Sequence, residues 1–398
     1  MDFELTKEEL DFRQEAEDFI KAETPSYWLD DVVYWPGGYG TFPEMESEFI
    51  DDCKVFLKKM GKKGWLSLSW PEKYGGKNSM MKQAIVNEIL SYYRMPHGGV
   101  GVSISGPTIV QVGSEEMKQE WLPKIAGGEA GFWLAYSEPN AGSDLGSLKT
   151  TAVEDGDDFI LNGQKIWSSG AHVVDYAWML ARTDPSASKH RGASLMIIDN
   201  KTPGITIRPI VNICGIHSFN EVFFDDVRVP KKNVVGEINR GFYNVMLALQ
   251  FERMMIGLGA FQRTLEDLVD YAKKTKRNGE YLSDNRIIRN KLASMAIEIE
   301  TLRGFYWQVA WMIDNGQVPE LEASVLKLFG TELGQKLADV GMDVLGPYGQ
   351  LDKGSKYAIF NGRIGLGYLD SVSGPIGAGT SEVQRSIIAT RGMGLPRA

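Results

Sequence analysis

The spacing of hydrophobic positions along the chain changes twice. Up to about residue 128 they recur at helical intervals, as at Leu10, Phe12, Ala16, Phe19 and Ile20. Short alternating segments follow between about 129 and 233, and long helical patterns return from about 234. The order predicts an α+β multidomain protein: an N-terminal α-helical domain (1–128), a middle β-barrel domain (129–233) and a C-terminal four-helix bundle (234–398).

Capping and turn residues place several expected boundaries. Thr6 and Glu9 form a capping box, and Ser114 begins a helix that ends near Gly127. Asn162-Gly163 predicts a hairpin turn within residues 159–167. Further strands are expected at 176–181, 193–198, 204–210 and 220–229, a loop at 34–43, and helices at 44–63, 242–271, 284–315 and 321–345.

Composition excludes several classes of protein. The 398 residues carry a net charge of −9 without a long run of Lys or Arg, so we expect no nucleic-acid partner. No segment approaches the ~20 apolar residues of a membrane span, and the acidic N-terminus lacks a signal core, so a cytoplasmic protein is expected. Cys53 and Cys214 are expected to be buried and unpaired. The four histidines (His97, His172, His190, His217) show no metal-binding spacing, and we predict no metal.

Three motifs carry candidate chemistry. The first is Tyr136-Ser-Glu-Pro-Asn-Ala-Gly-Ser-Asp144, in which Gly142 allows close backbone approach and the serines offer polar contacts. The second is Lys165-Ile-Trp-Ser-Ser169, where an indole and a hydroxyl could meet the face and edge of a planar ring, or Trp167 could be a core residue. The third is the glycine-rich tail from Gly374 to Arg385.

The three motifs resemble those of the acyl-CoA dehydrogenases, a family of FAD enzymes, and the resemblance covers nearly the whole chain. It implies FAD contacts near the first two motifs and in the tail, with Ser143 near FAD phosphate or CoA. The residues concerned are Leu134, Tyr136, Ser137, Gly142, Ser143, Trp167, Ser169, Thr380 and Glu382.

A further turn, Gly346-Pro-Tyr-Gly349, resembles the one that receives the adenine end of FAD from a neighbouring subunit, though it could also be an ordinary helix-ending turn. The family's Arg-x-x-Phe-Gly segment is altered here: Gly279 fits, Asn278 replaces the aromatic residue, and the arginine is displaced to Arg277. The resemblance therefore implies cofactor contacts by Arg277, Gly346 and Gly349.

The usual catalytic base of the family is missing, because Ala378 stands where the signature has Glu. Some branches carry their base as Glu-Arg in the first long C-terminal helix, and Glu252-Arg253 matches that pattern. Apolar neighbours favour the protonated form of a carboxyl, which suits a base for a weak carbon acid, whereas a structural glutamate is the alternative. Ala378 keeps the backbone N–H that binds the thioester carbonyl in the family, and Arg253 is expected to organise the pocket.

The resemblance implies α,β-dehydrogenation of an acyl-CoA to the trans-2-enoyl-CoA. A bulky, alicyclic, dicarboxylic or aryl-substituted acyl group (for example benzylsuccinyl-CoA-like) is expected, with electrons passed to an electron-transferring flavoprotein and a homotetrameric or mixed assembly. The alternatives are a non-catalytic subunit of a mixed oligomer and an acyl-CoA oxidase, whose chains are usually longer.

Overall fold

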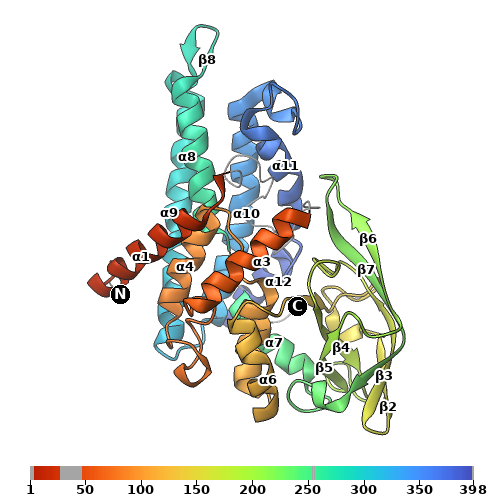
Figure 1. Ribbon diagram of the computed structural model, residues 1–398. Helices are drawn as coiled ribbons and strands as arrows, with labels where there is room; N and C mark the ends of the chain where they lie inside the picture. The colour runs from red at the N-terminus through yellow and green to blue at the C-terminus, as the bar shows by residue number, and fades with distance from the viewer. Residues whose placement is uncertain (1–3, 27–46, 253, 255, 397–398) are drawn as a thin grey trace. The chain divides into compact units, whose positions relative to one another are not determined.

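The computed structural model describes residues 4–26, 47–252, 254 and 256–396 (Figure 1). The expected loop at 34–43 lies outside these residues. The described residues form two compact units, one made of those up to 26, 80–95 and from 254 on, and the other of 47–79 and 96–252. Each unit combines separate stretches of the chain, so the predicted boundaries at 128 and 233 stay predictions.

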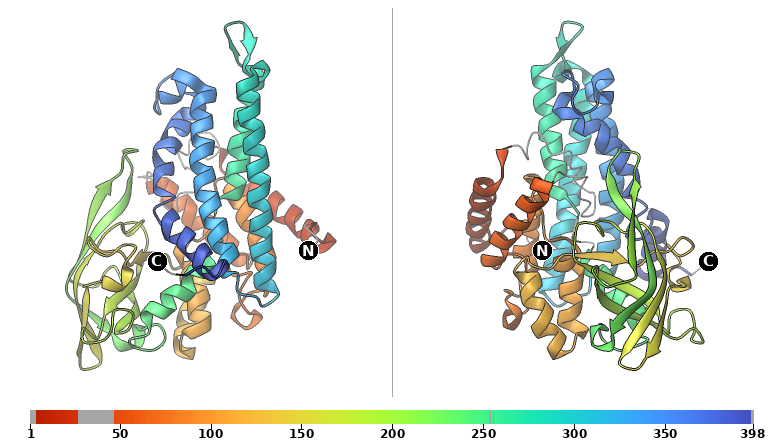
Figure 2. Two further views of the ribbon diagram at one scale, coloured as in Figure 1. Left: turned by 180° about the vertical axis from the view of Figure 1, so that it is seen from behind. Right: turned by 45° about the vertical axis from the view of Figure 1, so that its right-hand side comes forward.

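The first unit is helical. Its long helices α8, α9 and α10 run side by side (Figure 2) and pack on one another, while α4 packs on α8 and α9. The elements are α1 (Lys7–Glu23), α4 (Met80–Tyr92), α8 (Leu258–Lys274), β8 (Lys276–Arg277), β9 (Glu280–Tyr281), α9 (Arg286–Asp314), α10 (Glu320–Leu345), α11 (Arg363–Asp370) and α12 (Ser381–Ile387).

Helix α9 illustrates how the sequence specifies this unit. The Asn285 side chain accepts hydrogen bonds from the backbone N–H groups of Ile287 and Ile288, which satisfies two donors of the first turn. One face of the helix is then buried at intervals of three and four residues, at Ile288, Leu292, Met295, Ile299, Leu302 and Tyr306. Local capping and an apolar stripe therefore suffice to explain the helix predicted over 284–315.

The last residue of α9 also fixes the start of α4. Asp314 accepts hydrogen bonds from the N–H groups of Met80 (2.5 Å) and Met81 (3.0 Å). We expect Asp314→Ala to lower the free energy of unfolding by about 1 kcal/mol, the usual loss for an N-terminal cap. Asp270→Ala, which removes only an exposed pair with Lys274, is the control and should change it by less than ~0.5 kcal/mol. Equal shifts of the two denaturation midpoints would contradict the capping role.

The second unit combines helices with a curled seven-stranded sheet, ordered β1-β4-β2-β3-β7-β6 with β5 paired to β4 (Figure 1). Its helices are α3 (Ser47–Lys62), α5 (Gly106–Val112), α6 (Glu115–Ala126), α7 (Gly241–Glu252) and the π-helical η2 (Gly101–Ser105). Its strands are β1 (Phe132–Ala135), β2 (Thr151–Asp155), β3 (Asp158–Lys165), β4 (Tyr176–Arg182), β5 (Ala193–Asp199), β6 (Ile205–Val211) and β7 (His217–Pro230).

The hairpin predicted at Asn162-Gly163 is wrong. The turn lies at Gly156-Asp157, because Asp155 pairs with Asp158, and β3 runs straight through Asn162 and Gly163. An irregularity in the pairing with β7 occurs at this point instead. Gly163 is needed because a Cβ there would lie 2.5 Å from the Thr150 hydroxyl oxygen.

The helix expected over 242–271 is also wrong, since α7 ends at Glu252 and α8 begins at Leu258. Gly257, which precedes α8, has a non-helical ψ of 58°. Gly259 lies so close to α4 that a Cβ would meet the Glu88 carbonyl oxygen at 2.0 Å. The two glycines thus start a new helix that packs closely on α4.

The predicted fold class is confirmed: helical domains flank a middle β domain whose sheet is curled. The capping box at Thr6 and the cap at Ser114 form as predicted. Cys53 is buried, whereas Cys214 is only half-buried, because it lies in the turn between β6 and β7. Within the described ranges, no helix is long and apolar enough to span a membrane and no cluster of three metal-ligating side chains occurs.

Candidate active site

The first two sequence motifs meet in the second unit. The Tyr136–Asp144 motif follows β1, and the Lys165–Ser169 motif begins at the end of β3. The Ile166 N–H donates to the Ser137 carbonyl at 3.0 Å, so the two segments are joined directly. Residues 29 positions apart in sequence therefore present one continuous polar and aromatic edge.

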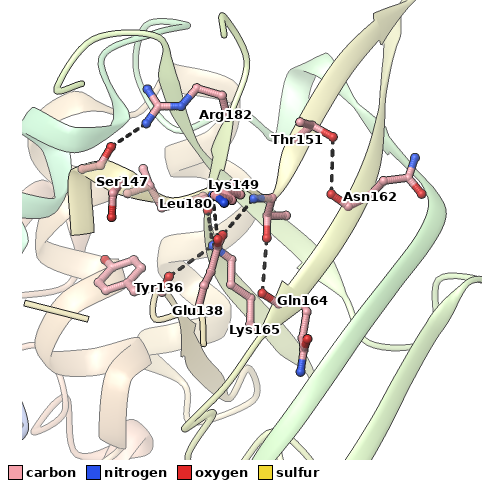
Figure 3. Close-up of polar contacts among 12 residues, drawn as sticks. Tyr136, Glu138, Ser147, Lys149, Thr151, Asn162, Gln164, Lys165, Leu180 and Arg182 are labelled. Carbon is pink, nitrogen blue, oxygen red and sulfur yellow. Dashed lines mark hydrogen bonds and ion pairs between the residues drawn. The ribbon is translucent and has the colours of Figure 1, made fainter. Parts of the chain in front are cut away.

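A buried ion pair fixes this junction (Figure 3). The Lys165 ammonium donates to the Glu138 carboxylate (2.8 Å), the Tyr136 carbonyl (3.1 Å) and the Leu180 carbonyl (2.8 Å), and the lysine is fully buried. Glu138 also accepts from the backbone N–H groups of Lys149 and Thr150. All three ammonium protons are thereby used, and the carboxylate accepts three donors, as burial of two charges requires.

The electrostatics of the pair favour two charged groups at neutral pH. Burial lowers the pKa of Lys165 to about 8, although the neighbouring Glu138 opposes the shift. Burial acts to raise the pKa of Glu138, but the charge and hydrogen bond of Lys165, together with hydrogen bonds from Thr150 and Lys149, outweigh it, so the pKa of Glu138 is lowered. The charged Glu138–Lys165 pair therefore links the segment after β1 to β3 and β4.

Trp167 is the most unusual residue of the junction. It has a positive φ of 58°, a conformation that costs a bulky residue of order 1–3 kcal/mol, and 57% of its surface is exposed. Its indole ring lies perpendicular to the Phe219 ring, with the ring centroids 5.8 Å apart. The alternative of a core tryptophan is therefore wrong, whereas Ser169, two residues on, is half-buried.

The remaining predicted residues of this unit lie around the same junction. Leu134 is a half-buried β1 residue opposite Trp178, while Tyr136 is buried. Gly142 and Ser143 are exposed and follow the turn that Glu138 and Ala141 close. The structure thus brings the predicted residues between Leu134 and Ser169 together in one unit.

In the first unit, Arg277 and the Gly346–Gly349 turn lie together. The Arg277 guanidinium donates to the carbonyls of Val344 (3.0 Å) and Leu345 (3.2 Å) at the end of α10. Gly346 has a φ of 59°, and a Cβ there would lie 3.0 Å from the Arg277 guanidinium. The turn ends α10, and Arg277 stabilises it by interacting favourably with the carbonyl end of the helix.

The tail forms a strained turn before α12. Ala378 has a φ of 53° and Gly379 one of 86°, and the Gln384 side chain donates to both of their carbonyls. No hydrogen bond among the described residues uses the Ala378 N–H. The Thr380 side chain caps α12. The pKa of Glu382 is lowered by hydrogen bonds that its carboxylate accepts from the Glu382 backbone and from the Thr380 side chain.

Glu252 is the last residue of α7, a helix that packs against η2, α5 and β5 in the second unit. Arg253 lies outside the described residues. The expected base therefore ends a helix of the unit that also holds Trp167 and Ser169, while Ala378 belongs to the other unit.

Sequence reasoning missed several residues of the junction. It assigned no role to His172, His217 and Asn220, which form one hydrogen-bonded group. Sequence reasoning included Lys165 in the second motif but did not predict that its side chain is buried. Strand alternation could have done so, because Lys165 has the same parity as the buried Phe159 and Leu161, and a lysine on a core face needs a buried partner.

Comparison with known proteins identifies relatives over the whole chain. Three family models match: acyl-CoA dehydrogenase N-terminal domain at residues 6–129, middle domain at 134–227 and C-terminal domain at 239–393.

Three similar proteins illustrate the relationship. Acyl-CoA dehydrogenase FadE26 of Mycobacterium tuberculosis is 37% identical over 352 residues, which cover 86% of this chain and 88% of that protein. The caffeyl-CoA reductase-Etf complex subunit CarC of Acetobacterium woodii is 30% identical and covers 95% of this chain and 96% of its own. The solved structure described as "Tcur3481-Tcur3483 steroid ACAD" has a TM-score of 0.88 and 32% identity, with 100% of both chains covered.

Proposed function

The chain belongs to the acyl-CoA dehydrogenase family of FAD-dependent oxidoreductases acting on CH–CH donors, and on that premise we propose that it oxidises the Cα–Cβ bond of an acyl-CoA to the trans-2-enoyl-CoA with Glu252 as the base. When bound, FAD supplies the acceptor for the β-hydride. Glu252 takes the α-proton on a carboxylate oxygen, and Arg253 organises the pocket around it.

The residues around Trp167 fit a flavin. An exposed indole in a strained backbone conformation is costly unless a ligand uses it, and a flavin ring offers an apolar face of matching size. We assign Trp167 to that face and the Ser169 hydroxyl to the polar edge of the ring. Leu134, Tyr136, Ser137, Gly142 and Ser143 line the same ligand, Ser143 on the phosphate or CoA side.

The first unit supplies the second set of proposed contacts. The unused N–H of Ala378 fits the thioester carbonyl, which gains negative charge as the α-proton leaves. Thr380 and Glu382 contact FAD from the same tail. Arg277, Gly346 and Gly349 receive the adenine end of a neighbouring subunit's FAD, with Arg277 shaping the turn through its bonds to α10.

For the substrate we propose a bulky acyl group, such as a steroid side chain or an alicyclic, dicarboxylic or aryl-substituted (benzylsuccinyl-CoA-like) chain. The similarity to a structure described as a steroid ACAD supports the first of these. For the electron acceptor we propose an electron-transferring flavoprotein, because the similar CarC is named as a subunit of an Etf complex. A cytoplasmic location and a homotetramer complete the proposal.

The alternative is a non-catalytic subunit of a mixed oligomer. The similar steroid ACAD structure is named for two components, which keeps this alternative open. It predicts a protein that gains activity only with a second, different chain.

One purification separates these functions. We expect a yellow protein, or one that becomes yellow with FAD, whose flavin absorbance bleaches anaerobically with one class in a panel of straight, branched, alicyclic, aryl and steroid acyl-CoA thioesters. Straight-chain thioesters are the matched comparison within the panel. A colourless protein that does not take up FAD would overturn the proposal, and rapid oxygen consumption with substrate would identify an oxidase.

A further inference from the structure

Two histidines from distant parts of the sequence stack beside the Trp167 segment. His172 lies between β3 and β4, and His217 begins β7. Their rings are 3.7 Å apart between centroids and only 15° from parallel. Asn220, which is fully buried, contacts both of them: its amide nitrogen is 3.0 Å from His172 Nδ1, and its oxygen is 2.7 Å from His217 Nε2.

The hydrogen bonds of Asn220 determine which protons the rings carry. Its amide nitrogen also donates to the Ser168 carbonyl at 2.9 Å, and a carbonyl can only accept, so the amide cannot be flipped. Its second N–H therefore points to His172 Nδ1, which must be unprotonated. The amide oxygen in turn accepts the proton of His217 Nε2. A proton added to His172 Nδ1 would face an N–H donor and break this arrangement.

The same asparagine fastens the segment that contains Trp167 and Ser169. The Ser168 N–H donates to the Asn220 carbonyl at 3.1 Å, and the Gly170 N–H donates to the Ser218 carbonyl at 3.2 Å. With the side-chain bond from Asn220 to Ser168, three hydrogen bonds hold Trp167–Gly170 to the start of β7. The strained backbone of Trp167 is thus stabilised from the side where the histidines lie.

We propose that His172 and His217, acting through Asn220, are positioning residues that keep the Trp167–Ser169 segment in the conformation that binds the flavin ring, and that they do so only while His172 Nδ1 is unprotonated. The inference rests on the proposed flavin contacts of Trp167 and Ser169. A segment held in its binding conformation loses less freedom on binding, so the network should strengthen FAD affinity.

The charges around the pair are compatible with this role. Burial and then the charge of His217 lower the pKa of His172 to about 4 from its ordinary 6.5. The other titratable groups on the adjoining segments are Asp175, Cys214, Glu221 and Arg208; Glu221 accepts a hydrogen bond from Gln164 and pairs across the strands with Arg208. The pKa of His172 is lower in the folded protein (about 4) than in the unfolded chain (6.5). The network therefore contributes folding stability that is fully present above about pH 6.5 and is lost as the pH falls towards 4.

The test is FAD titration of the full-length apoprotein between pH 8 and about 3.5, monitored by quenching of flavin fluorescence. In the wild type we expect the Kd for FAD to stay nearly constant down to about pH 5 and to rise about fourfold between pH 5 and about 3.5, where most of His172 is protonated. His172→Gln keeps a hydrogen-bond acceptor but cannot be protonated there, so its affinity should be near wild type at pH 8 and depend little on pH. His190→Gln, which removes a histidine of the same unit that lies against Phe242, should keep the wild-type dependence.

A measurement without substitutions complements the titration. Hydrogen–deuterium exchange at the imidazole C2 position, read by mass spectrometry, should show His172 of the FAD-loaded protein titrating below pH 5. A wild type that binds FAD with the same affinity at about pH 5 and about pH 3.5 would overturn the inference, as would a His172 that titrates near 6.5 with FAD bound. Failure to bind FAD even at pH 8 would instead overturn the proposed function.

Discussion

Replacing Glu252 by glutamine is expected to lower kcat by at least about 10²–10⁴-fold, the usual contribution of a general base, while the protein remains yellow. Glutamine keeps the size of the side chain but cannot accept the α-proton of the thioester. Since Glu252 ends α7, the change lies at a helix end and should leave the packing of that helix on η2 and α5 intact. Steady-state turnover and the flavin spectrum measure the two halves of the prediction separately.

Two further variants make this result specific. Glu237→Gln changes an exposed glutamate just before the same helix and should leave kcat unchanged. In the Glu252→Gln background, Ala378→Glu places a carboxylate where the family's signature has its base and should restore part of the lost activity. Retention of wild-type turnover by Glu252→Gln would remove Glu252 from the mechanism, and restored activity in the double variant would confirm that the two positions reach the same proton.

Local signals allowed much of the fold to be predicted. The caps at Thr6 and Ser114 form hydrogen bonds with residues three positions away. A short segment of sequence is therefore enough to predict them. The long helices α9 and α10 follow from sustained apolar stripes. The motif around Trp167 is predicted in a β segment, but as part of a hairpin that does not form, and its strained backbone could not be foreseen.

The features that could not be predicted depend on contacts between distant segments. Asn162-Gly163 has ideal turn residues, yet the pairing of β3 with β7 and the proximity of Thr150 place it inside a strand. The break before α8 reflects the close approach of Gly259 to α4, far away in sequence. His172 and Asn220 are 48 residues apart, and no local pattern shows that they form a hydrogen bond. Tertiary context overrides local propensity in each case.

Removing the buried ammonium of Lys165 should strongly destabilise the second unit. Lys165→Met keeps an unbranched apolar stem but leaves the Glu138 carboxylate, 7% exposed, without its counter-charge and two carbonyls without a donor. Breaking a buried ion pair in this way costs about 3–5 kcal/mol. At roughly 2–4 °C per kcal/mol, the apoprotein should melt roughly 6–20 °C lower.

An exposed ion pair of the same sheet provides the control. Lys231 pairs with Glu154 at 2.9 Å with 58% of the glutamate side chain exposed, and Lys231→Met should cost less than ~1 kcal/mol. The same loss of a lysine charge is therefore compared in a buried and an exposed setting. Similar melting temperatures for the two variants would show that Lys165 does not fasten the junction.

The double variant Lys165→Met/Glu138→Gln separates the ion pair from the lysine's other bonds. If the buried charge of Glu138 causes most of the loss, neutralising it should recover part of the stability, with a coupling of about 0.5–3 kcal/mol. The recovery should be incomplete, because the Tyr136 and Leu180 carbonyls still lack their donor. Tyr136 and Trp167 are each two residues from a member of the Glu138–Lys165 ion pair. FAD affinity should therefore decrease in the same order as stability: highest in the wild type, lower in the double variant and lowest in Lys165→Met. An affinity unaffected by Lys165→Met would mean that the junction is stable without being needed to shape the flavin site.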